Sequence, residues 1–408
     1  MLDGIPLLDM YTCTVFLLVV WVLGWLSNPD AKRLQKNILV SAILLYTLAM
    51  IVSTWLSGYV DTFGTARFQT WLRYIIIFIL LVTGIKTERD VKIVISCFSI
   101  FYFFEFALLY GGYLVKGGTV VVGAERIALG EGRLQNVNML GGTIAMILPL
   151  IFPLVALCKK YWHYLFVLGY VLVSIRVALL TGSRTTLLML CGLVILATLF
   201  SRYRFRMIPV VLLALPLAWV SLPEDMQNRY RTIWDPTISK IANTTMDARR
   251  MGFSHGLDNW STHPIFGTGA GSTPVAPLSD GSISPMANHG GGAHSLYGQI
   301  AGELGTVGIA AFLFMLSCFG INHYNIWKNY KYLREKNLGK EGLYCWWVSL
   351  ATMYGIAMIL IMGLGENGGY RTEWIWFAAF QILAAQIMQE KVTAAMQGKL
   401  SPSLPVRR

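Results

Sequence analysis

The sequence predicts an all-α membrane protein with about 11 transmembrane helices, and three observations support this prediction. Hydrophobic residues make up 55% of the 408 residues, charged residues make up only 13%, and the mean hydropathy is +0.56. A soluble chain with so few charges could not cover its own surface, so the composition excludes soluble enzymes, coiled coils and disordered proteins. The apolar residues also gather in runs of about 20, the length that a helix needs to cross a bilayer.

Eleven apolar runs are candidate spans. They lie at 8–26, 38–58, 69–86, 91–115, 138–157, 161–180, 184–200, 207–222, 295–320, 344–364 and 371–389. The first residues of the chain lack the basic segment that opens a signal peptide, so we expect the first run to remain as a span.

Lysine and arginine divide unequally between the two sets of loops that these spans create. Twenty of the 33 basic residues lie in the set that includes 27–37, 321–343 and the tail after 390, and eleven lie in the other set. Because basic loops stay in the cytoplasm, we expect the carboxyl terminus inside, and the amino terminus and residues 223–294 outside. Most of the net charge of +12 then faces anionic lipid. Nucleic acid is not an expected partner.

The spans divide the chain into four expected parts: an eight-span bundle at 1–222, a large polar outer loop at 223–294, three spans within 295–390, and a cytoplasmic tail at 391–408. Apolar residues at three- and four-residue spacing predict two short helices inside the outer loop, at 226–234 and 245–260. The glycine-rich segment after Gly267 predicts turns in which the backbone comes close to a membrane or a ligand.

The cysteine and histidine pattern predicts neither a metal site nor a cofactor. All six cysteines lie in or beside apolar runs and none forms a CxxC pair, so we expect them to be packing residues. Four of the six histidines lie in the outer loop: His255, His263, His289 and His294. Their spacing is not that of metal ligands on a helix.

His294 differs from the other histidines by its position. It stands immediately before the apolar run that begins at Ser295, so we expect it at the outer membrane surface, at the start of a helix. A neutral imidazole in that place can take a proton from an incoming hydroxyl. A capping or packing role is the alternative that position alone leaves open.

Arginines form a second group at the outer level. Six of them lie in the outer loop or near the outer ends of spans: Arg73, Arg176, Arg184, Arg249, Arg250 and Arg371. Guanidiniums that converge at one level suit a phosphate or pyrophosphate, because the planar fork binds such oxygens in pairs and keeps its charge. For each arginine the alternative is snorkelling, or pairing with one of three carboxylates, those of Glu303, Glu366 and Glu373.

Three motifs resemble the O-antigen ligase and polymerase superfamily, and the resemblance spans residues 130–320. The first is Gly182-Ser-Arg184-Thr-Thr-Leu at a span start. The second is Arg249 followed by His263-Pro264-Ile-Phe-Gly267-Thr-Gly269, and the third is the block from His294 to Glu303 after the large loop. Asn136-Val-Asn138 is similar to a weaker feature of the family. Ser295 and Phe253 depart from the family pattern, in which asparagine and tryptophan are usual.

The resemblance implies a multi-span, GT-C-like glycosyltransferase of the bacterial inner membrane. It would transfer a glycan from undecaprenyl pyrophosphate to an acceptor hydroxyl on the periplasmic side, with inversion and without a metal or cofactor. By motif match, His294 is the implied catalytic base, and Arg184 and Arg249 are the implied pyrophosphate-binding residues, with Arg250 an alternative for Arg249. Independently of the resemblance, the expected positions of Arg73, Arg176, Glu303 and Arg371 make them candidates for supporting roles.

The resemblance leaves the acceptor open. Lipid A core as acceptor would make the protein a ligase, a second lipid-linked glycan would make it a polymerase, and a protein hydroxyl would make it an oligosaccharyltransferase. The competing functions are a transporter of a small anion, a flippase of a lipid-linked sugar, or a noncatalytic scaffold. Transporters place charged sites at mid-membrane between inverted repeats, whereas the arginines here are expected at the outer ends of spans. The glycosyltransferase is therefore favoured.

Overall fold

The computed structural model describes residues 18, 19, 21–23, 26, 36–59, 62–116, 119–121, 124–127, 136–199, 204–235, 240–282 and 293–400. The first half of this chain contains α2 (Ile38–Leu56), α3 (Thr62–Gly84), α4 (Glu88–Lys116), β1 (Thr119–Val121), β2 (Ala124–Arg126), α5 (Val137–Ile147), the 3-10 turn η4 (Leu148–Leu150), α6 (Ile151–Leu157), α7 (Tyr161–Leu180) and α8 (Arg184–Leu199). The second half contains α9 (Arg204–Val220), α10 (Glu224–Arg231), α11 (Lys240–Thr262), α12 (Leu296–Glu335), α13 (Gly339–Met362) and α14 (Thr372–Met396).

The described residues agree with a helical membrane protein, but they do not confirm the predicted number of spans. Six helices among the described residues are long and apolar enough to cross a bilayer: Ile38–Leu56, Glu88–Val115, Val137–Leu157, Tyr161–Leu180, Leu296–Glu335 and Gly339–Met362. Three other predicted spans correspond to shorter apolar helices: Phe68–Gly84, Arg184–Leu199 and Val211–Val220. The predicted run 8–26 lies mostly outside the described residues. Helix α14 occupies the last predicted run, but it is not among the six helices that are long and apolar enough to cross a bilayer. A count of eleven therefore stays a prediction.

Two local expectations for the outer loop agree with the structure, and one element is unexpected. Helix α10 occupies most of the predicted segment 226–234, and α11 contains the predicted 245–260. Between α4 and α5, however, β1 and β2 pair as a small antiparallel hairpin, in which Thr119 is opposite Arg126. Two three-residue strands are too short to give the alternation by which a sequence predicts a strand.

Helix α12 is central to the packing. It contacts α2, α11, α13 and α14. Its predicted apolar run is interrupted at Gly305, whose φ of 64° and ψ of −162° are not helical. The segment that follows α11 packs against this kink, and Val307 donates its backbone N–H to the carbonyl of Ile265 at 3.1 Å. A Cβ at Gly305 would lie 2.5 Å from that carbonyl oxygen, so the close approach requires glycine.

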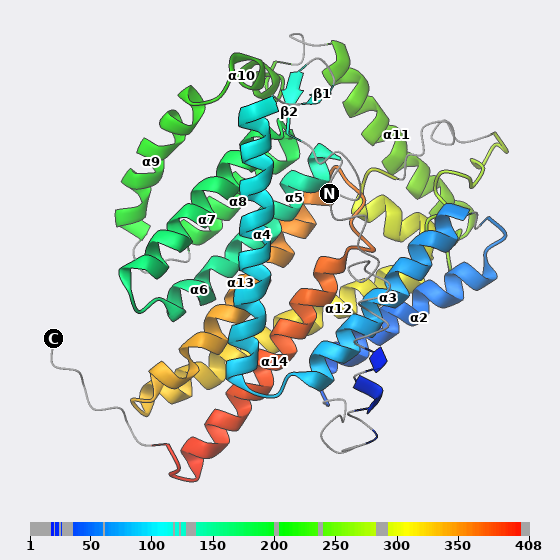
Figure 1. Cartoon of the computed structure of the whole chain (residues 1–408). Coiled ribbons are helices and arrows are strands. Elements are labelled where there is room, and N and C mark those ends of the chain that lie inside the picture. The colour runs from blue at the N-terminus through cyan, green and yellow to red at the C-terminus, as the bar shows by residue number, and fades with distance from the viewer. Residues whose placement is uncertain are drawn as a thin grey trace.

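The two ends of the helix bundle carry different polar contacts. At one end the ammonium of Lys391 in α14 pairs with the carboxylates of Glu88 in α4 and Glu341 in α13. Helices α10 and α11 and the β hairpin lie at the opposite end (Figure 1). The beginning of α12 joins the end of α13 there, because Leu296 donates its N–H to the carbonyl of Gly363 at 2.8 Å. This second end contains the candidate site.

Candidate functional site

His294 lies two residues before α12 and has an uncommon backbone conformation. Its φ is 45°, and Asn337 is the other non-glycine residue with positive φ in the described part of the chain. For a residue with a Cβ, this left-handed region costs about 1–2 kcal/mol, and such residues gather at functional sites. Ser295 then caps α12 by accepting a hydrogen bond from the N–H of Gly298. The half-buried imidazole is thereby fixed at the amino end of a long membrane helix.

Four glycines bring α11 close to the beginning of α12. Gly252 and Gly256 recur on one face of α11, and Gly298 and Gly302 recur on one face of α12, in both cases four residues apart. A Cβ at Gly252 would lie 2.5 Å from the carbonyl oxygen of Ala293, and a Cβ at Gly256 would lie 2.4 Å from that of Gly298. Small residues at this spacing let two helix backbones approach each other. Because Gly252 packs on the residue before His294, this contact sets the position of α11 relative to the histidine.

Replacement of Gly256 by alanine is expected to impair both stability and the site. The added methyl group would meet backbone atoms of Gly298 that cannot rotate away, so α11 must move, at a cost of about 1–3 kcal/mol. The matched control is Gly320→Ala in α12, where a Cβ would meet no atom within 4 Å. Thermal unfolding of the purified protein measures the difference. Equal melting temperatures for both variants would show that the glycine contact is dispensable.

Arg249 projects from α11 to the loop that connects α13 and α14. Its Nη2 lies 3.8 Å from Oε1 of Glu366. Its guanidinium also lies against the backbone of this loop, because a Cβ on Gly365 would be 3.2 Å from the arginine Cζ. The same Oε1 of Glu366 accepts a 2.7 Å hydrogen bond from the side-chain amide of Asn138, at the start of α5. Glu366 therefore joins α5 to α11.

Two further arginines lie near Arg249. Arg184 opens α8, and its Nη1 lies 3.4 Å from the hydroxyl of Thr232. Arg229 in α10 donates from Nε to the carbonyl oxygen of Gly182 at 2.7 Å, in the turn that precedes α8. The charges of Arg229 and Arg249 both act on Arg184. Burial lowers the pKa of Arg229, and the nearby charge of Arg249 lowers it further. The three guanidiniums thus form one cationic cluster.

The electrostatics keep His294 neutral. Burial lowers the pKa of His294 below its ordinary value, the carboxylate of Glu366 opposes that shift, and the cation of Arg249 adds to it. An imidazole whose pKa is below about 6.5 is mostly unprotonated at neutral pH. The arrangement therefore combines a proton acceptor with three cations, and the carboxylate of Glu366 lies beside one of them, Arg249.

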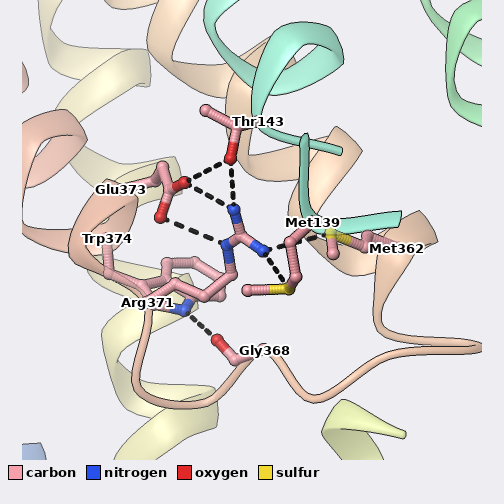
Figure 2. Close-up of polar contacts among 7 residues, drawn as sticks. All are labelled: Met139, Thr143, Met362, Gly368, Arg371, Glu373 and Trp374. Atoms are coloured by element: carbon pink, nitrogen blue, oxygen red, sulfur yellow. Dashed lines mark hydrogen bonds and ion pairs between the residues drawn. The ribbon is translucent and has the colours of Figure 1, made fainter. Parts of the chain in front are cut away.

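The guanidinium of Arg371 is occupied by partners within the protein. The side chain is 3% exposed. Its Nε and Nη2 contact both carboxylate oxygens of Glu373 at 3.1 and 2.5 Å, and Nη2 also donates to Thr143 at 2.8 Å. Its Nη1 points to the sulfur atoms of Met139 and Met362 (Figure 2). Arg371 thus holds the start of α14 against α5, where it contacts Met139, the residue that follows Asn138.

The other candidates from the sequence lie elsewhere. Arg250 is exposed on a different side of α11 from Arg249. Arg176 donates to the carbonyl oxygen of Ser221 at 2.9 Å, and Arg73 lies within α3. Glu303 is fully buried in α12, where its carboxylate accepts hydrogen bonds from Tyr370 and Thr273 at 2.7 Å each and from the N–H of Gly271 at 2.8 Å. Glu303 therefore connects the glycine-rich loop to α12.

The remaining outer-loop histidines have other surroundings. His255 is buried, and its Nε2 lies 3.2 Å from the carbonyl oxygen of Ala276. The ring of His263 contacts the ring of Tyr59 edge to face, and His289 lies outside the described residues. No group of three potential metal ligands comes together in the part of the chain that the structure describes.

Sequence reasoning missed Arg229 as a candidate and considered Glu366 solely as a pairing partner. Arg229 lies in a short helix that also contains three other charged residues, Glu224, Asp225 and Arg231. The sequence therefore does not distinguish Arg229 from an ordinary solvent-exposed charge. Glu366 and Asn138 are far apart in sequence and become neighbours through tertiary packing alone. The sequence does contain one signal of the contact between α11 and α12, because each helix carries glycines four residues apart.

Comparison with known proteins gives a match to a protein family. Residues 169–313 match the family model described as O-antigen ligase. The matched segment contains the three clustered arginines and His294, whereas Asn138 and Glu366 lie outside it. No curated protein matches the chain.

Proposed function

We propose that the chain moves a glycan from undecaprenyl pyrophosphate to an acceptor hydroxyl, a proposal that the match of residues 169–313 to the O-antigen ligase family supports. The reaction would occur at the periplasmic face of the bacterial inner membrane, with inversion and without a metal ion. The observation that carries the proposal is the convergence of a neutral His294 with Arg184, Arg229 and Arg249 at one end of the bundle.

The arginines have the charge and shape that the leaving group requires. When the bond between the sugar C1 and the pyrophosphate oxygen breaks, the electron pair stays on that oxygen and negative charge grows there. Guanidiniums that are already in place stabilise this charge more strongly in the transition state than in the bound donor, which accelerates the reaction. Their planar forks also suit the paired oxygens of a pyrophosphate.

His294 has the protonation state that the acceptor requires. The acceptor oxygen attacks C1 on the face opposite the pyrophosphate, and its proton passes to the unprotonated imidazole nitrogen. A base of this kind contributes about 10²–10⁴-fold to a rate. The imidazolium that forms is stabilised by the nearby carboxylate of Glu366 and destabilised by Arg249, so the histidine can release the proton before the next turnover.

Replacement of Glu366 by glutamine is expected to move the acidic limb of the pH–rate profile to lower pH. Glu366 raises the pKa of His294, so loss of its charge lowers that pKa and leaves the base neutral in more acidic solution. Glutamine still offers an oxygen to the amide of Asn138. The acidic limb of kcat/KM reports the pKa of the base in the free enzyme. Glu335→Gln, an exposed change at the other end of the bundle, serves as the control. An acidic limb that moves to higher pH would contradict this role.

Two experiments test the proposed function and its acceptor. In sealed vesicles that contain the purified protein and a lipid-linked glycan, the proposal predicts cleavage of the sugar–pyrophosphate bond. Movement of intact donor across the membrane without cleavage would instead indicate a flippase.

A deletion strain identifies the acceptor. Loss of long chains indicates a polymerase, and loss of attachment of intact chains to lipid A core indicates a ligase. Loss of glycosylated protein indicates an oligosaccharyltransferase.

A further inference from the structure

Helix α11 presents an apolar stripe that the described part of the chain does not cover. Its buried face consists of Gly252, His255, Gly256 and Asn259. Next to that face lie Phe253, Leu257 and Trp260, which are 41%, 39% and 37% exposed. These three residues follow the i, i+4, i+7 spacing that places side chains on one side of a helix.

The side of α11 that is opposite its buried face is mainly polar. It carries Arg250, Ser254, Asp258 and Ser261, with Met251 at its edge. Helix α11 therefore has three sides: one packs on α12, one is apolar and exposed, and one is polar and exposed. Such a division is typical of a helix that lies at the boundary between a bilayer and water.

The apolar stripe continues into the exposed face of α12. Trp260 donates from Nε1 to the hydroxyl of Thr306 at 3.1 Å. Ile265 and Val307, which are joined by a backbone hydrogen bond, extend the stripe beyond Trp260. From Val307 the exposed face of α12 runs on through Leu313 and Phe314, which are 56% and 37% exposed.

This continuity identifies the chemistry of the partner. Helix α12 is long and apolar enough to cross a membrane, so the partner of its exposed apolar face is lipid. Because the apolar stripe of α11 continues this face of α12 without an intervening polar residue, the stripe also contacts lipid. Trp260 lies where the stripe borders the polar hydroxyl of Thr306, and tryptophan is enriched at membrane–water interfaces.

We propose that Phe253, Leu257 and Trp260 insert into the leaflet at the candidate-site end of the protein, so that α11 is an interfacial helix. The stripe begins one turn after Arg249, which lies between it and the buried face. Contact with lipid would therefore hold the Arg249 guanidinium at the level of lipid head groups. This last consequence rests on the proposed function, whereas the insertion itself does not.

The test places a fluorescent amino acid on the purified full-length protein, either at Leu257 or at Ser261, which is on the polar side of the same helix. The protein is reconstituted into vesicles of phosphatidylcholine and phosphatidylglycerol with brominated acyl chains. We expect several-fold stronger quenching at position 257 than at 261, with emission at shorter wavelength. Leu313 provides the reference for a position in lipid. Equal quenching at 257 and 261 would overturn the proposal.

A second comparison separates insertion from catalysis. The contrast between positions 257 and 261 is expected to be unchanged when His294 is also replaced by alanine. If transfer activity is absent from the wild type while the contrast persists, the proposed function fails and the interfacial helix stands. If transfer occurs without the contrast, the opposite holds. A stripe that binds a protein partner instead would leave 257 as accessible to water as 261 in these vesicles.

Discussion

Replacement of His294 by alanine is expected to reduce glycan transfer by about 10²–10⁴-fold, the usual contribution of a general base. The acceptor hydroxyl would then lose its proton to water alone, while the arginine cluster would still bind the donor. The loss should therefore appear in kcat more than in KM. The measurement is the transfer rate of the purified variant at saturating donor.

The fold should tolerate this change. His294 is half-buried and lies in a left-handed conformation, and alanine loses the side chain without filling new space. His163→Ala is the matched control, since His163 is exposed and lies in the first turn of α7 at the opposite end of the molecule. Full activity of His294→Ala, or an equal loss in His163→Ala, would remove the histidine from the mechanism.

Replacement of Arg249 by alanine is expected to lower kcat by about 10²–10³-fold, as removal of one preorganised donor to a developing charge does in other enzymes. Arg249 is the member of the cluster that acts on Arg184, Arg229 and His294 together. Arg249→Lys should recover part of the rate, because it restores the charge without the planar fork.

Arg250→Ala provides the neighbouring control. Arg250 is exposed on the polar side of α11, whereas the side chain of Arg249 is 23% exposed and faces Glu366. We expect near-normal transfer from Arg250→Ala, measured beside Arg249→Ala under the same conditions. A large loss in Arg250→Ala with little change in Arg249→Ala would reverse the assignment that the geometry supports.

The sequence predicted the helical membrane class and the two outer-loop helices because both depend on local patterns. Apolar runs of membrane length and the spacing of Met226 and Tyr230 are properties of neighbouring residues, and α10 and α11 formed where these patterns lie. The break at Gly305 was not predictable in the same way. A single glycine in an apolar run gives no sign that another segment packs on it.

The candidate site was predicted in part. Arg184 and Arg371 look alike in the sequence, since each opens a helix at the same end of the bundle. The structure separates them: Arg184 joins the cluster, and Arg371 is enclosed by Glu373 and Thr143. Glu366 acquires its place from the contact with Asn138 and Arg249, which come from distant parts of the chain. Such neighbours depend on tertiary packing, which local patterns do not encode.

Release of undecaprenyl pyrophosphate by the purified protein tests the central claim most directly. The protein in lipid vesicles is mixed with an undecaprenyl-pyrophosphate glycan and an acceptor, and the released lipid carrier is measured beside the transferred glycan. The account predicts that the wild type releases one carrier for each glycan transferred, and that His294→Ala releases almost none. Equal release by both proteins, or appearance of glycan on the other side of the vesicle with the carrier still attached, would contradict it.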